Sequence, residues 1–206
     1  AAQSSLIIIT VPANGLKKIK DEMLLHIQTG SAILFMPGTG GVEYMFSEYV
    51  RRGIILLGLQ RIPAVYRLIE PGKSVRISGR RKSGLFLGGI PSKAAGEYAP
   101  ILAELFGMPC TALPNYLNVT LTPSNPILHT SRLYSMFMNY REGVFYHRNF
   151  LFYQEWDDSS SDVLLKCDGE LQSLLRKIPE LDLSYVKSLK EHYESNTKSE
   201  MTYKIS

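Results

Sequence analysis

A histidine at the junction of two differently patterned regions is the first candidate for chemistry in this chain. His129 follows the turn-rich sequence of residues 122–126, TPSNP, and stands at the start of a helix-like run. A joint between two domains is a common place for a ligand cleft, and histidine exchanges protons near neutral pH. His129 is therefore a candidate acid–base group. The alternative, which residue type alone favours, is a partly buried histidine that caps a turn.

Composition and charge narrow the class of protein. The chain has 206 residues, of which 45% are hydrophobic, and can bury the core of one large domain or of two small ones. The basic residues are spread out apart from residues 51–52 and 80–82, and no basic run is interleaved with aromatic residues. We therefore expect no nucleic-acid partner. The net charge of +4 suits carboxylate or phosphate ligands, and it suits solubility alone equally well.

Cysteine usage and the lack of long apolar runs bear on location. Cys110 and Cys167 lie far apart and form no CxxC pattern. We expect reduced thiols in a cytoplasmic protein, with one long-range disulfide as the alternative. No apolar run is long enough to span a membrane, and the first residues carry no basic segment of a secretory signal. We therefore expect no membrane partner.

The N-terminal region alternates apolar runs with amphipathic segments. Apolar runs at residues 6–11, 31–36 and 54–59 lack polar alternation, which is typical of strands that are buried on both faces. Helices are predicted between them at residues 16–28 and 42–52. This order of strands and helices is the repeating pattern of a parallel α/β sheet.

Ligands of such a sheet bind beyond the carboxyl ends of the strands. The loops at that edge are residues 11–14, VPAN, and residues 36–41, MPGTGG. Both precede helix N-termini, which favour anions, and glycine allows a backbone to approach a ligand closely. The alternative is that proline and glycine merely end the strands.

A nucleotide-binding fingerprint is absent from the sequence. A dinucleotide-binding sheet begins with a strand that is followed by G-x-G-x-x-G, and no such run occurs here. Only residues 1–5 precede the first strand, and a sheet that began there would expose a long apolar edge. We expect that the chain lacks the first half of a nucleotide domain.

The middle of the chain departs from this alternation. Residues 64–69 are predicted as a strand. Residues 74–79 alternate apolar and polar side chains, which predicts a half-exposed antiparallel strand. Residues 84–90 are its predicted partner across a basic connection, residues 80–83. A helix is predicted at residues 94–106.

The region beyond the joint is predicted to be helical. Apolar periodicity indicates helices at residues 126–139, 161–178 and 184–193. Because the pattern changes at the joint, the domain boundary is predicted after residue 117. The other histidines of this region are isolated and form no HxH or HExxH spacing, so no metal ligands are predicted.

Three motifs, in this order, resemble the octopine/nopaline (opine) dehydrogenases. They are residues 5–13, SLIIITVPA, then residues 36–41, MPGTGG, and residues 124–129, SNPILH. The asparagine-proline-x-x-histidine run is the most specific of them, and many nicotinamide-dependent dehydrogenases share the valine-proline-alanine loop. The resemblance covers nearly the whole chain but only the later part of a complete family member.

The resemblance implies a fold and an activity. The fold would be α/β followed by all-α. Residues 1–117 would form the later half of a Rossmann-type dinucleotide-binding domain, and residues 118–206 a helical substrate domain like the C-terminal domains of 6-phosphogluconate dehydrogenases. The family joins an amino acid to a 2-keto acid such as pyruvate with reduced NAD or NADP, and also runs the reverse oxidation. We expect these small molecules as partners, a homodimer as an assembly to test, and no activity from this chain alone.

The resemblance also implies site residues. His129 matches the family's catalytic histidine and would relay a proton during hydride transfer. Asn125 and Arg132 lie one helical turn before and after it. Asn125 would share its pocket, and Arg132 would bind a substrate carboxylate or else be a surface arginine. Asn196 stands where the family's partner aspartate is expected. The residues matching the nicotinamide-ribose loops are Val11, Pro12, Ala13, Pro37 and Gly38.

Two other functions stay open. One is another two-domain dehydrogenase, such as a ketopantoate reductase or a 3-hydroxyacid dehydrogenase. Those enzymes use a lysine in the helical domain, and residues 118–140 contain none. The other is a non-catalytic binding or dimerisation module. The choice between NAD and NADP is also open, because the residue that decides it follows a strand outside this sequence.

Overall fold

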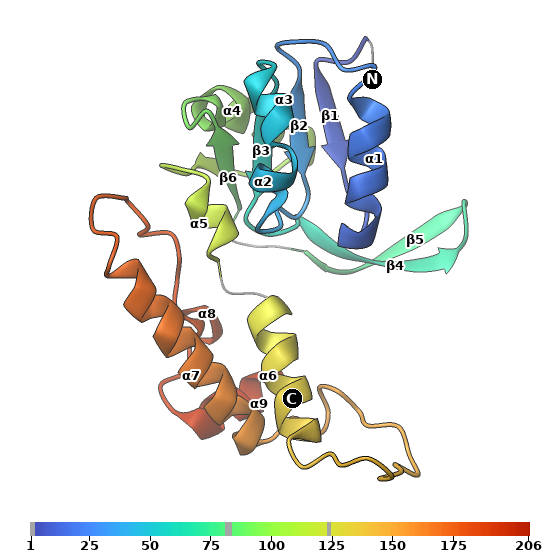
Figure 1. The fold of residues 1–206 in the computed structure, drawn as a ribbon, viewed down its shortest axis with the longest axis vertical. Coiled ribbons are helices and arrows are strands. Elements are labelled where there is room, and N and C mark those ends of the chain that lie inside the picture. The colour runs from blue at the N-terminus through green and yellow to red at the C-terminus, as the bar shows by residue number, and fades with distance from the viewer. Residues whose placement is uncertain (1–2, 81–83, 123–124) are drawn as a thin grey trace. The chain divides into compact units, whose positions relative to one another are not determined.

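The computed structural model describes residues 3–80, 84–122 and 125–206, with the side chain of Asn125 excepted. The chain forms two compact units, Ala1–Leu121 and Thr122–Ser206 (Figure 1). The domain boundary predicted after residue 117 falls inside a short helix, α5 (Leu117–Thr120). The first unit ends after this helix because α5 packs onto its sheet.

The first unit is built on a mixed sheet. In the described part of the chain its strands lie in the order β1-β2-β3-β6-β7. They are β1 (Leu6–Ile9), β2 (Ala32–Phe35), β3 (Ile55–Leu59), β6 (Leu85–Ile90) and β7 (Cys110–Ala112). β1, β2 and β3 are parallel, as the sequence predicts, while β6 runs antiparallel to β3. The carboxyl ends of β1 and β2 lie side by side, since Ile9 is in register with Phe35.

Short helices connect and cover these strands. They are the 3-10 turn η1 (Ala13–Gly15) and the helices α1 (Leu16–Met23), α2 (Val42–Met45), α3 (Ser47–Arg51) and α4 (Ala94–Phe106). The prediction of one helix at residues 42–52 is wrong, because the helix breaks at Phe46. The buried Phe46 ring lies 4.8 Å from the ring of Phe35 and 5.1 Å from that of Tyr49, between centroids. This close packing favours the break over a continuous helix.

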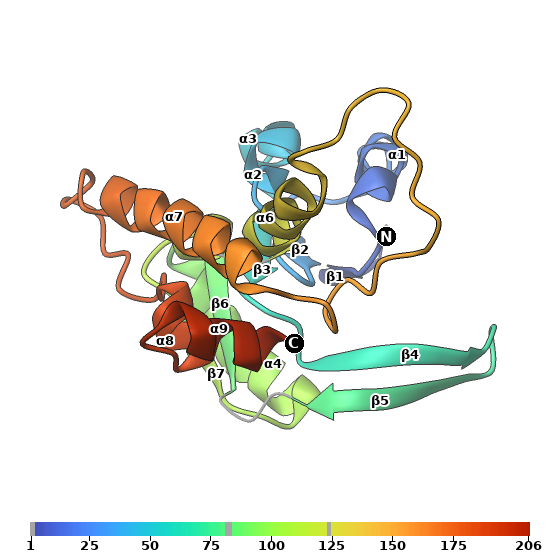
Figure 2. The same cartoon turned by 90° about the horizontal axis from the view of Figure 1, so that it is seen from below.

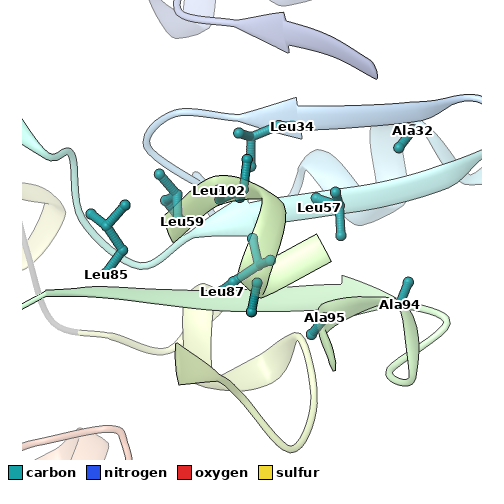
Figure 3. Packing of buried hydrophobic residues seen from close by; sticks show 10 residues of the cluster. Ala32, Leu34, Leu57, Leu59, Leu85, Leu87, Ala94, Ala95 and Leu102 are labelled. Carbon is teal, nitrogen blue, oxygen red and sulfur yellow. The ribbon is translucent and has the colours of Figure 1, made fainter. Parts of the chain in front are cut away.

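A hydrophobic core of the first unit lies between the sheet and α4. Leucines of β2, β3 and β6 gather around Leu102 of α4 (Figure 3). The helix turns small residues, Ala94, Ala95 and Ala99, toward the strands. A Cβ at Gly89 of β6 would lie only 2.8 Å from the Ala95 nitrogen. The missing side chain at Gly89 therefore lets α4 approach the sheet closely.

The predicted pairing of residues 74–79 with residues 84–90 is wrong. β5 (Ser74–Arg80) instead pairs with β4 (Ala64–Glu70) in a separate antiparallel hairpin, which extends away from the main sheet (Figure 2). β6 pairs with β3, because its apolar side chains are buried, whereas β5 is exposed along its length. The basic connection is thus not a hairpin tip, and residues 81–83 of it lie outside the described residues.

Three glycines provide the surface on which α5 rests. A Cβ at Gly38 would lie 2.4 Å from Val119, one at Gly88 would lie 2.7 Å from Val119, and one at Gly58 would lie 2.6 Å from the Tyr116 hydroxyl. Gly38 follows β2, while Gly58 and Gly88 are partners on β3 and β6. Side chains at these positions would displace Tyr116 and Val119. The glycines therefore fix the position of α5, the last helix of the first unit.

The second unit is a small helical assembly. Its helices are α6 (Asn125–Phe137), α7 (Asp158–Leu175), α8 (Leu189–Tyr193) and α9 (Lys198–Ile205). α7 contacts both α6 and α9 (Figure 2). The buried core consists of Leu128, Trp156, Leu164, Leu189, Met201 and Ile205. None of the described helices of the chain is long and apolar enough to span a membrane.

A buried carboxylate joins α7 to α8. Asp168 is 4% exposed, and its Oδ2 accepts a hydrogen bond from the Leu189 amide at 2.9 Å. Burial raises the pKa of Asp168, and this effect outweighs the hydrogen bonds from Leu189 and Gln172, which lower it. Asp168 thus satisfies the first turn of α8 while carrying a charge that burial disfavours.

Replacing Gly58 by alanine should destabilise the first unit by about 1 to 3 kcal/mol, because the methyl group would overlap Tyr116. Hydrogen exchange of the β3 and β6 amides would measure the loss of protection. Gly96→Ala is the matched control, because no atom lies within 4 Å of an added Cβ at that position in α4. It should be neutral or stabilising by up to about 1 kcal/mol. Unchanged exchange in Gly58→Ala would contradict the proposed packing.

Replacing Asp168 by asparagine should change how stability depends on pH. A raised pKa means that the folded protein binds the proton more tightly than the unfolded chain, so this group lowers the free energy of unfolding as pH rises. Asp168→Asn should therefore gain stability relative to wild type between about pH 4, where carboxyls begin to ionise, and neutrality. Urea unfolding followed by fluorescence of Trp156, the single tryptophan, measures the difference.

Asp162 on the same helix provides a control of opposite sign. The hydrogen bond from Lys166 lowers the pKa of Asp162, so Asp162→Asn should lose stability relative to wild type as pH rises. A difference between wild type and Asp168→Asn that does not vary with pH would contradict the role assigned to this carboxyl group.

Candidate functional site

α6 places His129 beside the core of the second unit without burying it. Leu128 is 6% exposed and anchors the helix, and His129 follows on the adjoining helix face. The His129 Nε2 lies 3.1 Å from the Tyr153 hydroxyl oxygen, and the tautomer of the ring decides which group donates. The ring also meets Phe152 edge to face, with centroids 5.3 Å apart. Because the described hydrogen bond goes to a side chain, the turn-capping alternative is not supported.

Arg132 is buried, and its guanidinium is fully engaged within the second unit. The side chain is only 5% exposed. Its Nε donates to the Phe152 carbonyl at 3.1 Å and its Nη2 to the Glu155 carbonyl at 2.5 Å. Its Nη1 donates to the Ser160 hydroxyl at 2.9 Å. The surface-arginine alternative is therefore wrong, and the predicted role in binding a substrate carboxylate has no free guanidinium nitrogen to support it.

The start of α7 completes the surroundings of Arg132. Asp157 is the N-cap of the helix, and its Oδ1 accepts from the Ser160 amide at 2.9 Å and lies 3.4 Å from Arg132 Nη1. Burial acts to raise the pKa of Asp157, but the hydrogen bonds from Ser160 and the charge of Arg132 together lower it. Trp156 is buried and donates from its Nε1 to the Ser161 hydroxyl at 2.8 Å. These contacts tie the end of the connecting segment to the core.

Two other residues of the helical part, Asn125 and Asn196, were singled out from the sequence. Asn125 is the first residue of α6, but its side chain lies outside what the structure describes, so its sharing of a pocket with His129 stays a prediction. Asn196 lies between α8 and α9, and its amide donates to Glu200 at 2.7 Å. The described partners of the His129 ring are Tyr153 and Phe152.

The predicted cofactor loops lie at the carboxyl ends of β1 and β2. Val11, Pro12, Ala13 and Pro37 are exposed there, beside each other in the sheet because the Met36 amide donates to the Ile9 carbonyl at 3.0 Å. Exposed backbone at this edge fits the nicotinamide end of a dinucleotide.

Gly38 has a different role from its neighbours in the loop. Its amide donates to the Leu59 carbonyl at 2.7 Å, and the absence of a side chain makes room for Val119. The amide is therefore already used inside the first unit. The predicted approach of a ligand to Gly38 gains no support from this packing, which explains the glycine by itself.

A cavity of about 220 Å³ in the first unit was not indicated by any sequence motif. Its lining includes Glu43, Pro91, Asn115 and Tyr116. Glu43 accepts hydrogen bonds from the Gly41 amide at 2.9 Å and the Thr120 hydroxyl at 2.8 Å. Burial, and then the charge of Glu43, raise the pKa of Tyr116 above its ordinary range, so the phenol stays neutral. The cavity contains none of the predicted site residues.

Cysteine and metal chemistry gain no support from the geometry. Cys110 and Cys167 are both free thiols. Burial raises the pKa of Cys110 to about 11, so this thiol is protonated and weakly nucleophilic. Throughout residues 3–80, 84–122 and 125–206, no cluster of histidine, cysteine, aspartate or glutamate is arranged to hold a metal ion.

Tyr153 is the site residue that sequence reasoning missed. It lies in the segment that follows α6, where the structure has neither helix nor strand until α7 begins. Its exposed position and its distance of 24 residues from His129 leave no periodic signal in the sequence. The one available sign is the aromatic density of residues 150–156, FLFYQEW, which alone does not select a tyrosine.

Comparison with known proteins shows what the helical part of the chain is similar to. Residues 112–206 match the family described as "NAD/NADP octopine/nopaline dehydrogenase, alpha-helical domain". An octopine dehydrogenase of Mizuhopecten yessoensis is 23% identical over 92% of this chain and 49% of its own length. An opine dehydrogenase of Haliotis discus hannai is 26% identical over 92% of this chain and 49% of its own length. The chain spans about half the length of the curated relatives it matches.

Solved structures show the same fold. Octopine dehydrogenase with NADH and L-arginine superposes with a TM-score of 0.76 and 21% identity, over 99% of this chain and 54% of that chain. D-mandelate dehydrogenase with NADH and anilino(oxo)acetate superposes with a TM-score of 0.56 and 17% identity, over 88% and 55%. The helical part of the chain, residues 112–206, therefore matches the model of the octopine/nopaline dehydrogenase helical domain, and the chain as a whole has the fold of octopine dehydrogenase.

Proposed function

We propose that this chain is the later part of an opine-type dehydrogenase, which condenses an amino acid with a 2-keto acid by NADH-dependent reduction and runs the reverse oxidation. The observation that carries the proposal is His129, which stands in an asparagine-proline-x-x-histidine run on the first helix of a unit that the family model matches. Its ring is only partly buried and keeps access to a substrate. This chain would contribute the carboxyl-end loops of the nucleotide sheet and the helical unit with the acid–base group.

His129 has a defined task in such a reaction. Joining an amine to a keto acid converts the carbonyl oxygen into water, so a proton must reach that oxygen as the carbon–nitrogen double bond forms. His129 would donate this proton, and in the reverse direction it would accept one from the attacking water. A bound reduced nicotinamide supplies the hydride for the carbon atom. Val11, Pro12, Ala13 and Pro37 would hold the nicotinamide end at the edge of the sheet.

The partners of the reaction follow from its class. Octopine dehydrogenase structures contain NADH with L-arginine, with agmatine or with pyruvate. We propose a 2-keto acid of the pyruvate class, an amino acid still to be identified, and NAD in preference to NADP. The same proposal places the protein in amino acid metabolism, and its two free cysteines support a cytoplasmic location. A homodimer is the assembly to test.

A second function is another NAD(P)-dependent reductase of 2-keto acids. The likeness to D-mandelate dehydrogenase, with a TM-score of 0.56, favours it. A putative 2-dehydropantoate 2-reductase of Enterococcus faecalis has a TM-score of 0.52. Both scores lie below the 0.76 of octopine dehydrogenase. An amino-acid requirement for turnover separates the two functions.

Replacing His129 by alanine should abolish most of the activity of the protein extended upstream to include its complete nucleotide domain. NADH oxidation is followed by absorbance with pyruvate and a panel of amino acids. We expect amino-acid-dependent turnover in wild type and a loss of about 100- to 10,000-fold in His129→Ala, which is the usual contribution of general acid–base catalysis. His26→Ala is the control, because His26 lies exposed after α1.

The outcomes are distinct. Turnover with the keto acid alone would favour the second function. A His129→Ala variant as active as wild type would remove His129 from the mechanism. No turnover and no binding of NADH to the extended protein would contradict both functions and leave a non-catalytic module.

A further inference from the structure

We propose that Tyr153 is a positioning residue for His129, and that Arg132 holds Tyr153 in place. In this inference the phenol hydroxyl donates to the His129 Nε2, so that the neutral ring carries its proton on Nδ1. The inference rests on the proposed function of His129 as the acid–base group. It assigns to Arg132 a role different from binding a substrate carboxylate.

Arg132 holds the backbone on both sides of Tyr153. Arg132 donates to the carbonyl of Phe152, immediately before Tyr153, and to the carbonyl of Glu155, shortly after it. The segment has no helix or strand of its own to fix it. Two hydrogen bonds from one rigid, buried guanidinium therefore determine where the Tyr153 main chain runs.

Arg132, which holds the Tyr153 segment, and His129, which Tyr153 contacts, lie on the same helix. His129 and Arg132 are three residues apart on α6, so they lie on neighbouring positions of one face. Arg132 sets the backbone of Tyr153, and the Tyr153 side chain returns to His129 at 3.1 Å. The geometry of the pair therefore depends on α6, on the segment that leads to α7 and on the start of α7, which holds Arg132.

Aromatic packing limits the motion of both His129 and Tyr153. The Phe152 ring meets His129 edge to face at 89°, and it also packs against Tyr153 with centroids 5.0 Å apart. Behind it, Trp156 is 4% exposed in the core, and its amide donates to the Tyr153 carbonyl at 2.8 Å. The segment is thus fixed on both sides of Tyr153.

The chemistry of the phenol and the imidazole decides which of them donates the hydrogen bond. A phenol hydroxyl is a better donor than acceptor toward a neutral imidazole, so the hydrogen bond at Nε2 favours the tautomer that is protonated on Nδ1. In this inference Nδ1–H is the group that acts on a substrate oxygen. When Nδ1–H gives its proton to that oxygen, Nε2 takes the hydroxyl proton of Tyr153. Tyr153 is 47% exposed and regains a proton from water.

Tyr153→Phe tests the catalytic consequence in the protein with its complete nucleotide domain. The change removes one hydroxyl and keeps the ring packing, so we expect kcat to fall roughly 100-fold with KM within about twofold, as for loss of a group that orients a catalytic histidine. His129→Ala and the double variant His129→Ala with Tyr153→Phe should be equally slow. Tyr146→Phe is the matched control, because Tyr146 is a comparably exposed tyrosine of the same segment.

The tautomer of His129 gives a readout that does not depend on turnover. Nitrogen-15 NMR of the same protein, labelled on histidine and recorded where imidazoles are neutral, should assign the His129 proton to Nδ1 in wild type. Tyr153→Phe should return the ring to the Nε2-protonated form that free histidine prefers in water. Arg132→Lys keeps the charge but loses the rigid fork, and it should have the same effect on His129. Trp156 fluorescence reports whether that variant is folded.

The results separate this inference from the function on which it rests. Loss of activity in His129→Ala, with full activity and an unchanged His129 spectrum in Tyr153→Phe, would overturn the inference and leave the proposed function intact. An Nε2-protonated ring in wild type would overturn it as well. Absence of amino-acid-dependent turnover would contradict the proposed function, while the NMR spectra would still decide whether Tyr153 and Arg132 set the tautomer.

Discussion

The second unit depends on the burial of one guanidinium. A buried arginine is strongly destabilising unless its donors are paired, and Arg132 is paired through all three nitrogens. Its acceptors lie on two parts of the chain that pack against α6, the segment around Tyr153 and the first turn of α7. The same side chain therefore satisfies backbone carbonyls of an irregular segment and adds a hydrogen bond between α6 and α7. Loss of one acceptor would leave one nitrogen of a buried guanidinium unpaired, which is costly.

A different constraint governs the first unit. There the absence of side chains at Gly38, Gly58 and Gly88 lets Tyr116 and Val119 lie directly on the sheet. Buried apolar strands give the sheet its stability, but they do not choose where α5 rests. The close approach of the Tyr116 and Val119 side chains to the glycine backbone does, because any Cβ at these positions would overlap a ring or a branched side chain. Glycines that look like ligand-binding glycines in the sequence can therefore serve packing instead.

The sequence predicted those strands and helices whose burial leaves a regular pattern of apolar residues. Continuous apolar runs identified β1, β2 and β3 and their parallel order, because βαβ connections leave little choice. Alternation identified an antiparallel strand at residues 74–79, but the predicted half-burial and the predicted partner are wrong. Period-2 patterning says nothing of which strand lies alongside. The nearer strand, β4, took that position. Helix α6 was predicted from periodicity, and its histidine from motif and place.

The site could be predicted only where residues are close in sequence. The position of His129 follows from its own helix, but the burial of Arg132 depends on carbonyls 20 and 23 residues away. Main-chain acceptors in an irregular segment leave no mark in the amino-acid sequence, since any residue supplies a carbonyl. Tyr153 was missed for the same reason. Its relevance arises from where Arg132 holds the backbone rather than from its own surroundings in the sequence.

The contacts of Tyr153 and Arg132 bear on how the proposed acid–base group, His129, is oriented. A histidine whose partner came from another unit would be assembled only when the units closed on a substrate. Here the ring, the hydroxyl that contacts it and the arginine that holds the segment all lie in the second unit, on α6 and the segment that leads to α7. The orientation of His129 is then independent of the first unit. In the proposed function, a proton donor that is oriented within one unit would need no rearrangement of its own partners at the moment of reaction.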